Sequence, residues 1–432
     1  QPVPGDRAAP LLAADLRGVR AVTHWAQLLH FYQPPTQTHD ILVRVANESY
    51  RPLLRVLAKH PNARVAVNIQ GVLTQLLQEH GQGDVIESLM RLADRGIIEF
   101  VGSGKYHPIL PLVPAERRAS SIAQNHETNA SAYGEDWKPR GFFPPEMCFG
   151  PQITPEIAAA GHDWLIMSGV GCPGPWPIDR VHRVKAGEGS LAVLFRDDVR
   201  SNKISFRRTS PEEFIHDLQE VGGGNDSYVV TAMDAETFGH HIAGWENEFL
   251  DETLGLLTHQ GRRGAHRVQM AFPSTVVDQF PAGEVIQPLP SSWSTSEQDI
   301  ESGDPYPLWK SPGNHLHAMQ WEYVDHCMYL EGVARQYARE KEAATHAAIA
   351  SERLEPALHS CQFWWASRRP MWDFTMVHRG FMLLSEVELN AAHAIALGDA
   401  PEEVKQESRW RVAAANELRF AIENALVGSA RP

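Results

Sequence analysis

Two acidic residues that follow apolar, strand-like runs are the strongest candidates for chemistry in this sequence. Glu146 comes after Gly-Phe-Phe-Pro-Pro (141–145), and Asp234 comes after Ser-Tyr-Val-Val-Thr-Ala-Met (227–233). In barrels of alternating strands and helices, the carboxyl ends of the strands form the active site. Two carboxyl groups at such an end could cleave a glycosidic bond, because one can protonate the leaving oxygen while the other attacks or activates water.

The residues that follow Asp234 leave a second chemistry open. Asp234 and Glu236 are spaced to point to the same side of a strand, and a buried charge is costly unless it is bonded or used. Asp234 with His240 and His241 could instead bind a metal ion. Further ligands could come from other histidines: His24, His30 and His107. A third interpretation is that these acids are solvent-exposed loop residues.

The elements that position these residues alternate between strand-like and helical segments from residue 21 to about 280. This alternation predicts a mostly parallel sheet, either closed into a barrel or doubly wound. The strand candidates are 22–30, 64–69, 97–101, 141–143, 164–167, 192–195, 228–233 and 268–272.

The rest of the chain differs in composition from this region. Residues 1–20 lack periodicity and are expected to be an extension, and the Pro-, Ser-, Gly- and Trp-rich segment 281–316 is expected to be a connector that borders the cleft. Residues 317–432 predict a helical domain. Its expected helices are 318–349, 351–366, 376–397 and 401–427.

Composition excludes several classes of function. The chain has 432 residues and a net charge of −14 without a basic cluster, which argues against nucleic acid or an anionic membrane as partner. Four widely spaced cysteines form no C-x-x-C pair, as expected for a cytoplasmic protein. Secretion stays open, because the chain starts at Gln1 rather than at a methionine.

Five segments, in order along the chain, resemble the motifs of glycoside hydrolase family 57. They include LHFYQP at the end of the first strand, GFFPPE and MDAETFGH, and they extend over nearly the whole sequence. The position of a second histidine in many members is occupied here by Tyr32. The five segments are residues 29–34, 96–108, 141–146, 233–240 and 360–365.

This resemblance implies a fold and a mechanism. The fold is an incomplete (β/α)7 barrel followed by a helical C-terminal region. The mechanism is retaining and uses neither metal nor cofactor: Glu146 is the nucleophile and Asp234 the general acid/base. Asp234 must then keep a raised pKa, with burial and the neighbouring Glu146 and Glu236 as causes.

Other residues are predicted to bind the substrate. Polar side chains could bind sugar hydroxyls, Glu99 by resemblance to the family's second motif, and tryptophans could stack on glucose rings. For each of them a structural role is the alternative. The Arg-Asp-Asp segment 196–198 could also border the site. The predicted binding residues are His30, Gln33, Glu99, His107, Glu236, His240, Trp245, Trp293, Trp364 and Trp365, with Trp309 as a further candidate.

The expected substrate is an α-1,4-glucan, either hydrolysed or transferred to another glucan. Chain length leads us to expect an α-amylase or 4-α-glucanotransferase rather than a branching enzyme. Three alternatives remain open: an α-galactosidase-like activity, a metal-dependent polysaccharide deacetylase on a similar barrel, and a glucan-binding protein without turnover.

Overall fold

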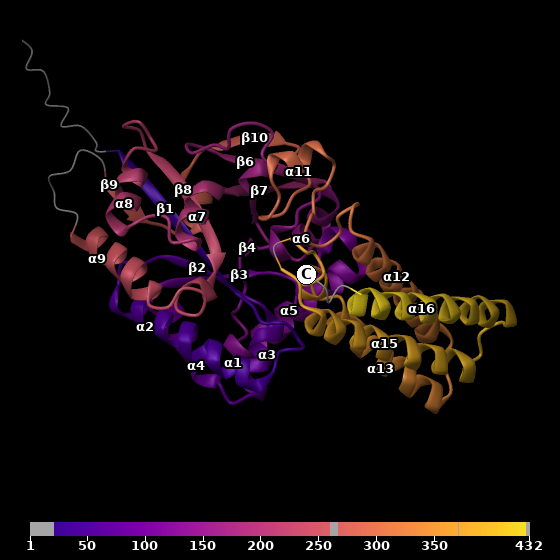
Figure 1. Cartoon of the computed structure of the whole chain (residues 1–432). Helices are drawn as coiled ribbons and strands as arrows, with labels where there is room; N and C mark the ends of the chain where they lie inside the picture. Colours follow the sequence, from indigo (N-terminus) through magenta and orange to yellow (C-terminus); the bar gives the residue numbers. More distant parts are fainter. Residues whose placement is uncertain (1–20, 260–266, 370, 429–432) are drawn as a thin grey trace, which may run out of the picture.

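The computed structural model describes residues 21–259, 267–369 and 371–428. The predicted extension 1–20 lies outside these residues. Figure 1 shows a curled sheet surrounded by helices, and a group of long helices that extends away from it. The strands are β1 (Val22–Phe31), β2 (Val65–Ile69), β3 (Ile98–Gly102), β4 (Gly141–Phe142), β5 (Trp164–Ser168), β6 (Val181–Ala186), β7 (Gly189–Arg196), β8 (Ser227–Asp234), β9 (Arg267–Met270) and β10 (Ala282–Ile286).

The described strands form one sheet in the order β10-β6-β7-β5-β4-β3-β2-β1-β8, with β9 beside the start of β1. All pairings are parallel except β6 with β7. Seven parallel strands, β8-β1-β2-β3-β4-β5-β7, curl until the two ends of the row approach each other. There, the backbone N–H of Asp197 donates to the carbonyl oxygen of Val230 at 2.7 Å. The prediction of an incomplete (β/α)7 barrel is therefore confirmed.

The strands read as apolar runs because both of their faces are buried. Inside the barrel, side chains such as Leu28, Val101 and Ile166 pack together, and Val276 of α10 contributes to the same core. Outside, separate apolar clusters join the strands to their helices. The helices of this region are α1 (His39–Val45), α2 (Arg51–Lys59), α3 (Gly71–Glu79), α4 (Gly83–Asp94), α5 (Ala115–Tyr133), α6 (Thr154–Ala159), α7 (Asp198–Ser205), α8 (Pro211–Gln219), α9 (Glu252–His259) and α10 (Pro273–Gln279).

Two strands were not predicted from the sequence, because their apolar patterns are weak. β6 has the sequence VHRVKA, in which polar side chains interrupt the apolar ones, and it pairs antiparallel with β7. β10 lies in the expected connector, is mostly exposed and pairs with β6. The connector thus adds an edge strand to the sheet.

The C-terminal region is helical, as expected, but two helix bounds were wrong. The chain leaves the helix at 338–340, and the predicted helix 351–366 is interrupted after Ala357. The interruption has a physical reason, because the segment after it pairs with the barrel: the N–H of Ser360 donates to the carbonyl of His107 at 3.0 Å. The elements are α11 (Glu297–Glu301), α12 (His315–Tyr337), α13 (Lys341–Ala357), α14 (Cys361–Trp364), α15 (Phe374–Leu397) and α16 (Glu402–Gly428).

A buried ion cluster joins this helical region to the barrel. Arg117 of α5 donates to Glu331 of α12 and, at 3.2 Å, to Glu355 of α13. All three side chains are at most 12% exposed. Among the described helices, none combines the length and the apolar character that a membrane span requires.

Candidate active site

Glu146 lies in the turn that follows β4, where the two prolines of the motif end the strand. Its backbone is left-handed, with φ of 57°, which is uncommon for a residue other than glycine and is found at functional sites. The turn directs the carboxylate inward, and its side chain is 13% exposed. The indole N–H of Trp293 donates to Oε2 at 3.0 Å, and the hydroxyl of Ser360 donates to Oε1 at 2.9 Å.

Ser360 connects Glu146 to His107. The serine hydroxyl has one proton, which it gives to Glu146, so its 2.8 Å contact with Nδ1 of His107 requires that the histidine donate. Nδ1 of His107 also lies 3.5 Å from Oε1 of Glu146. Burial holds the pKa of His107 well below its usual value, so the ring is a neutral donor. A chain of donors from His107 through Ser360 therefore fixes the carboxylate.

Asp234 is the last residue of β8. In the parallel pairing of β8 with β1, it lies beside His30. It is partly exposed, and within the described residues its carboxyl group accepts no side-chain hydrogen bond. The guanidinium of Arg196 is buried nearby and donates to the carbonyl of Ala232 at 2.8 Å. The backbone of Asp234 is thus fixed by β8, and its carboxyl group has no side-chain hydrogen-bond partner among the described residues.

His30 is oriented by Asn68. The amide N–H groups of Asn68 donate to the carbonyls of Val101 and Gly102, so its oxygen accepts from Nδ1 of His30 at 2.7 Å. Burial lowers the pKa of His30, which leaves Nε2 of a neutral ring as an acceptor. Among the described residues Nε2 has no partner.

The side chains of Glu236 and Gln33 form a hydrogen bond with each other. Glu236 accepts hydrogen bonds from the hydroxyl of Tyr50 and, at 2.9 Å, from Nε2 of Gln33. The oxygen of Gln33 accepts from Gln37 at 2.7 Å. These two predicted substrate-binding residues are therefore satisfied by protein partners and form a buried layer beside Asp234.

The site gathers three carboxyl groups, and its electrostatics disfavour ionising all of them. Burial, helped by the charge of Asp234, raises the pKa of Glu146 and that of Glu236 to about 8. Burial also raises the pKa of Asp234, against the opposing influence of His30 and Arg196. Donors on both oxygens favour the ionised form of Glu146, and Asp234 lacks such donors. The two acids therefore differ in hydrogen bonding, and ionisation of Asp234 raises the pKa of Glu146 and of Glu236.

The structure does not bring every predicted residue to this group. The carboxylate of Glu99 accepts from the backbone N–H of Ser274, at the start of α10, at 3.1 Å. Burial raises the pKa of Glu99 to about 7. Trp245 is 4% exposed, stacks on Phe249 and donates to the carbonyl of Ile204. It is a core residue rather than a surface for sugars, as is the fully buried Trp309.

The remaining candidates lie at the border of the site. His240 contacts Oε2 of Glu48 at 2.6 Å, and Glu48 precedes Tyr50 by two residues. Trp364 and Trp365 are partly exposed, stand edge to face at 4.6 Å and follow Ser360 by four and five residues. Trp293 alone among the predicted tryptophans contacts a catalytic candidate.

Sequence reasoning missed several residues that shape the site. Tyr50 and Asn68 carry no motif signal, although each fixes a predicted residue. Tyr32 belongs to the first motif, but only the structure shows that it stacks on His107 with ring centroids 4.0 Å apart. Ser360 stands inside the fifth motif, but only the structure reveals its contact with Glu146.

The alternative of a metal site at Asp234 is not supported. In the described part of the chain, one group of three metal-ligating side chains has its ligand atoms within 4.8 Å of one another, and that group lies in the helical region.

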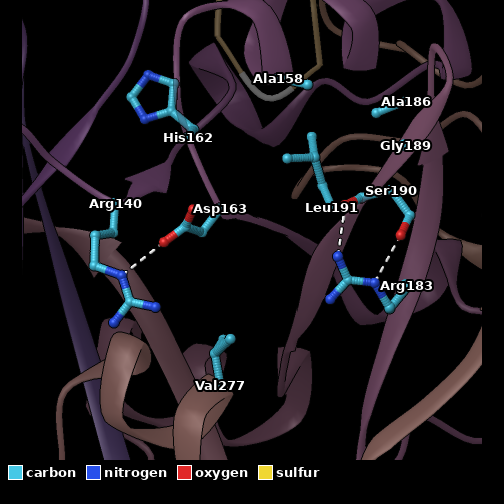
Figure 2. Close-up of a pocket in the computed structure, with 10 residues that line it drawn as sticks. All are labelled: Arg140, Ala158, His162, Asp163, Arg183, Ala186, Gly189, Ser190, Leu191 and Val277. Atoms are coloured by element: carbon cyan, nitrogen blue, oxygen red, sulfur yellow. Dashed lines mark hydrogen bonds and ion pairs between the residues drawn. The ribbon is translucent and has the colours of Figure 1, made fainter.

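The cavity of about 470 Å³ in Figure 2 is remote from the acids. Its lining includes Arg140, Asp163 and Ser190, near the amino ends of β4, β5 and β7.

Comparisons with known proteins find relatives in sequence and in fold. An α-amylase of Pyrococcus horikoshii is 26% identical over 290 residues, which are 63% of this chain and 43% of that protein. A 4-α-glucanotransferase of Thermococcus kodakarensis is 25% identical over 63% of this chain and 42% of its own length. The matched part thus spans less than half of these relatives.

A solved structure shares the fold over most of its length. The GH57-type branching enzyme of Pyrococcus horikoshii superposes with a TM-score of 0.67 at 15% identity, and the match covers 90% of this chain and 94% of that one. The model of glycosyl hydrolase family 57 matches residues 22–288, which is more than half of the sequence. The chain belongs to glycosyl hydrolase family 57.

Proposed function

We propose that this protein is a retaining glycoside hydrolase or transglycosylase that acts on α-1,4-linked glucans by double displacement. The observation that carries the proposal is the asymmetry between two neighbouring acids. Glu146 accepts hydrogen bonds at both carboxylate oxygens, whereas Asp234 lies free at the end of β8. A carboxylate with fixed orientation suits a nucleophile, and an unbonded acid suits proton transfer.

In the first step, a carboxylate oxygen of Glu146 attacks the anomeric carbon while Asp234 gives its proton to the departing glycosidic oxygen. The bond between sugar and leaving group breaks as the bond to Glu146 forms. In the second step, Asp234 takes a proton from water or from an acceptor hydroxyl, which displaces Glu146. The free Nε2 of His30 can accept a hydrogen bond from a sugar hydroxyl.

The choice of an α-glucan rests on the relatives, because curated members are named α-amylase and 4-α-glucanotransferase. Hydrolysis and transfer use the same acids and differ in the acceptor of the second step. Incubation with maltopentaose separates them, since transfer yields longer as well as shorter products and hydrolysis yields only shorter ones.

The decisive experiment combines this assay with Glu146→Gln and Asp234→Asn variants. Each should lose at least about 1,000-fold in rate, as expected when a nucleophile or its proton donor is removed. Glu388→Gln is the matched control, because it alters a fully buried acid on α15, away from the barrel. Full activity of the Glu146 or Asp234 variant would refute the catalytic pair, and a first product with inverted anomeric configuration would refute retention.

A further inference from the structure

The helical region contains a cluster of metal-ligating side chains that the proposed chemistry does not use. Glu342 and His346 are four residues apart on α13, so both lie on one face of that helix. His393 of α15 faces them, with its ring centroid 4.5 Å from that of His346. One ligand atom from each of the three side chains lies within 4.8 Å of the others.

The packing of α13 against α15 produces this juxtaposition. The two helices run antiparallel, as the contact of His346 with Asn390 and the 3.0 Å ion pair of Arg353 with Glu386 show. Figure 1 shows both helices in the group that extends away from the barrel. The cluster lies in the first half of α13, and Ser360 follows the far end of that helix.

Asn390 prepares His346 as a ligand. Its amide N–H donates to the carbonyl of Glu386 at 2.9 Å, which leaves its oxygen to accept from Nδ1 of His346, also at 2.9 Å. With the proton on Nδ1, the lone pair of His346 is on Nε2. A second residue that holds the other ring nitrogen is the usual companion of a metal-bound histidine.

The other two ligands are free to bind. Within the described residues, the carboxylate of Glu342 and the ring nitrogens of His393 make no hydrogen bond or ion pair. Glu342 and His393 are exposed and His346 is half-buried, so an ion can enter from solvent. Tetrahedral bonds of about 2.1 Å place ligand atoms about 3.4 Å apart, so the three side chains would move closer together on binding an ion.

We propose that Glu342, His346 and His393 bind one zinc ion, which joins α13 to α15. Two imidazoles with one carboxylate suit Zn²⁺, whereas Mg²⁺ and Ca²⁺ prefer ligand sets made of oxygen atoms. Three protein ligands leave the fourth position to water. The ion would join the two helices that flank segment 358–373. This site is independent of the proposed glycosidase mechanism.

The test measures zinc binding to the whole chain after treatment with a chelator, by equilibrium dialysis in the presence of excess Mg²⁺. The wild-type protein should bind one zinc more than the His346→Ala and His393→Ala variants. Asn390→Ala should keep the site but weaken its affinity about 10- to 100-fold. Zinc should also raise the melting temperature of the wild-type protein and leave that of His346→Ala unchanged.

His39 and His80 supply the matched control. Their Nδ1 atoms lie 3.3 Å apart on the surface of the barrel, but the described residues offer them no third ligand. A His80→Ala variant should therefore bind as much zinc as the wild-type protein. Equal zinc binding by the wild-type protein and His346→Ala, or a loss of the same size in His80→Ala, would overturn the proposal. Circular dichroism of each variant establishes that the helices are intact.

Discussion

Replacing Glu146 with glutamine should stabilise the fold, and the gain should grow with pH. Burial raises the pKa of Glu146 from 4.5 to about 8. A carboxyl group whose pKa is raised by folding stabilises the folded state fully only below its unfolded pKa. This contribution is lost as the pH rises through the folded value. Glutamine has no such loss, because it does not ionise.

The magnitude follows from the two pKa values. A shift from 4.5 to about 8 corresponds to about 5 kcal/mol once the pH exceeds both values, at about 1.4 kcal/mol for each pKa unit. Only part of this range is needed for a measurement. Between about pH 5.5 and about pH 8, the difference in unfolding free energy between variant and wild type should move by about 3 kcal/mol in favour of glutamine.

The assay is denaturant unfolding of both proteins at several pH values. Comparing the two proteins at each pH removes the contributions of all other titrating groups, including Glu236 and Asp234 to the extent that they titrate alike. Losing the hydrogen bonds from Trp293 and Ser360 changes the difference in unfolding free energy by the same amount at every pH. Glu87→Gln, at a side chain that is 69% exposed, is the control and should show no trend. A pH-independent difference for Glu146→Gln would refute the reasoning.

Two further predictions concern the contacts of the site and of the fold. Trp293→Phe removes the N–H that donates to Glu146, so the pKa of the proposed nucleophile rises. The acidic limb of kcat/KM against pH should then move by about 1–2 units to higher pH, since a hydrogen bond to a charged group contributes about 1.5–3 kcal/mol; an unchanged limb would contradict this role. Arg117→Ala leaves Glu355 buried without a cation, and leaves Glu331 only Arg335 at 3.8 Å. It should cost about 3 kcal/mol in unfolding free energy, whereas a loss below about 1 kcal/mol would contradict this prediction.

The sequence was sufficient for the barrel because its strands are buried on both faces. Runs such as those of β2 and β5 are apolar almost throughout, and they predict strands wherever they occur. Glu146 and Asp234 stand out at the ends of such runs for the same reason. β6 and β10 lie at the edge of the sheet, where polar residues are tolerated and the apolar signal disappears.

The roles of the surrounding residues could not be predicted, because they depend on which side chain meets which. The sequence does not distinguish the roles of Trp245 and Trp293. Trp245 packs on Phe249 in the core, whereas Trp293 donates a hydrogen bond to Glu146. Glu99 belongs to a motif that resembles a family signature, but its carboxylate points away from the acids. Residue type gives the chemistry that is available, and tertiary packing decides where it is used.

The nucleophile candidate depends on three distant parts of the chain. Glu146 follows β4 of the barrel, Trp293 belongs to the connector, and Ser360 lies between two helices of the C-terminal region. Both donors fall beyond residue 288, where the match to the family model ends. Without them, no donor would compensate the buried carboxylate, and the pKa of Glu146 would rise further. The helical region therefore contributes to the candidate site, because Ser360 orients Glu146 and opposes the rise of its pKa.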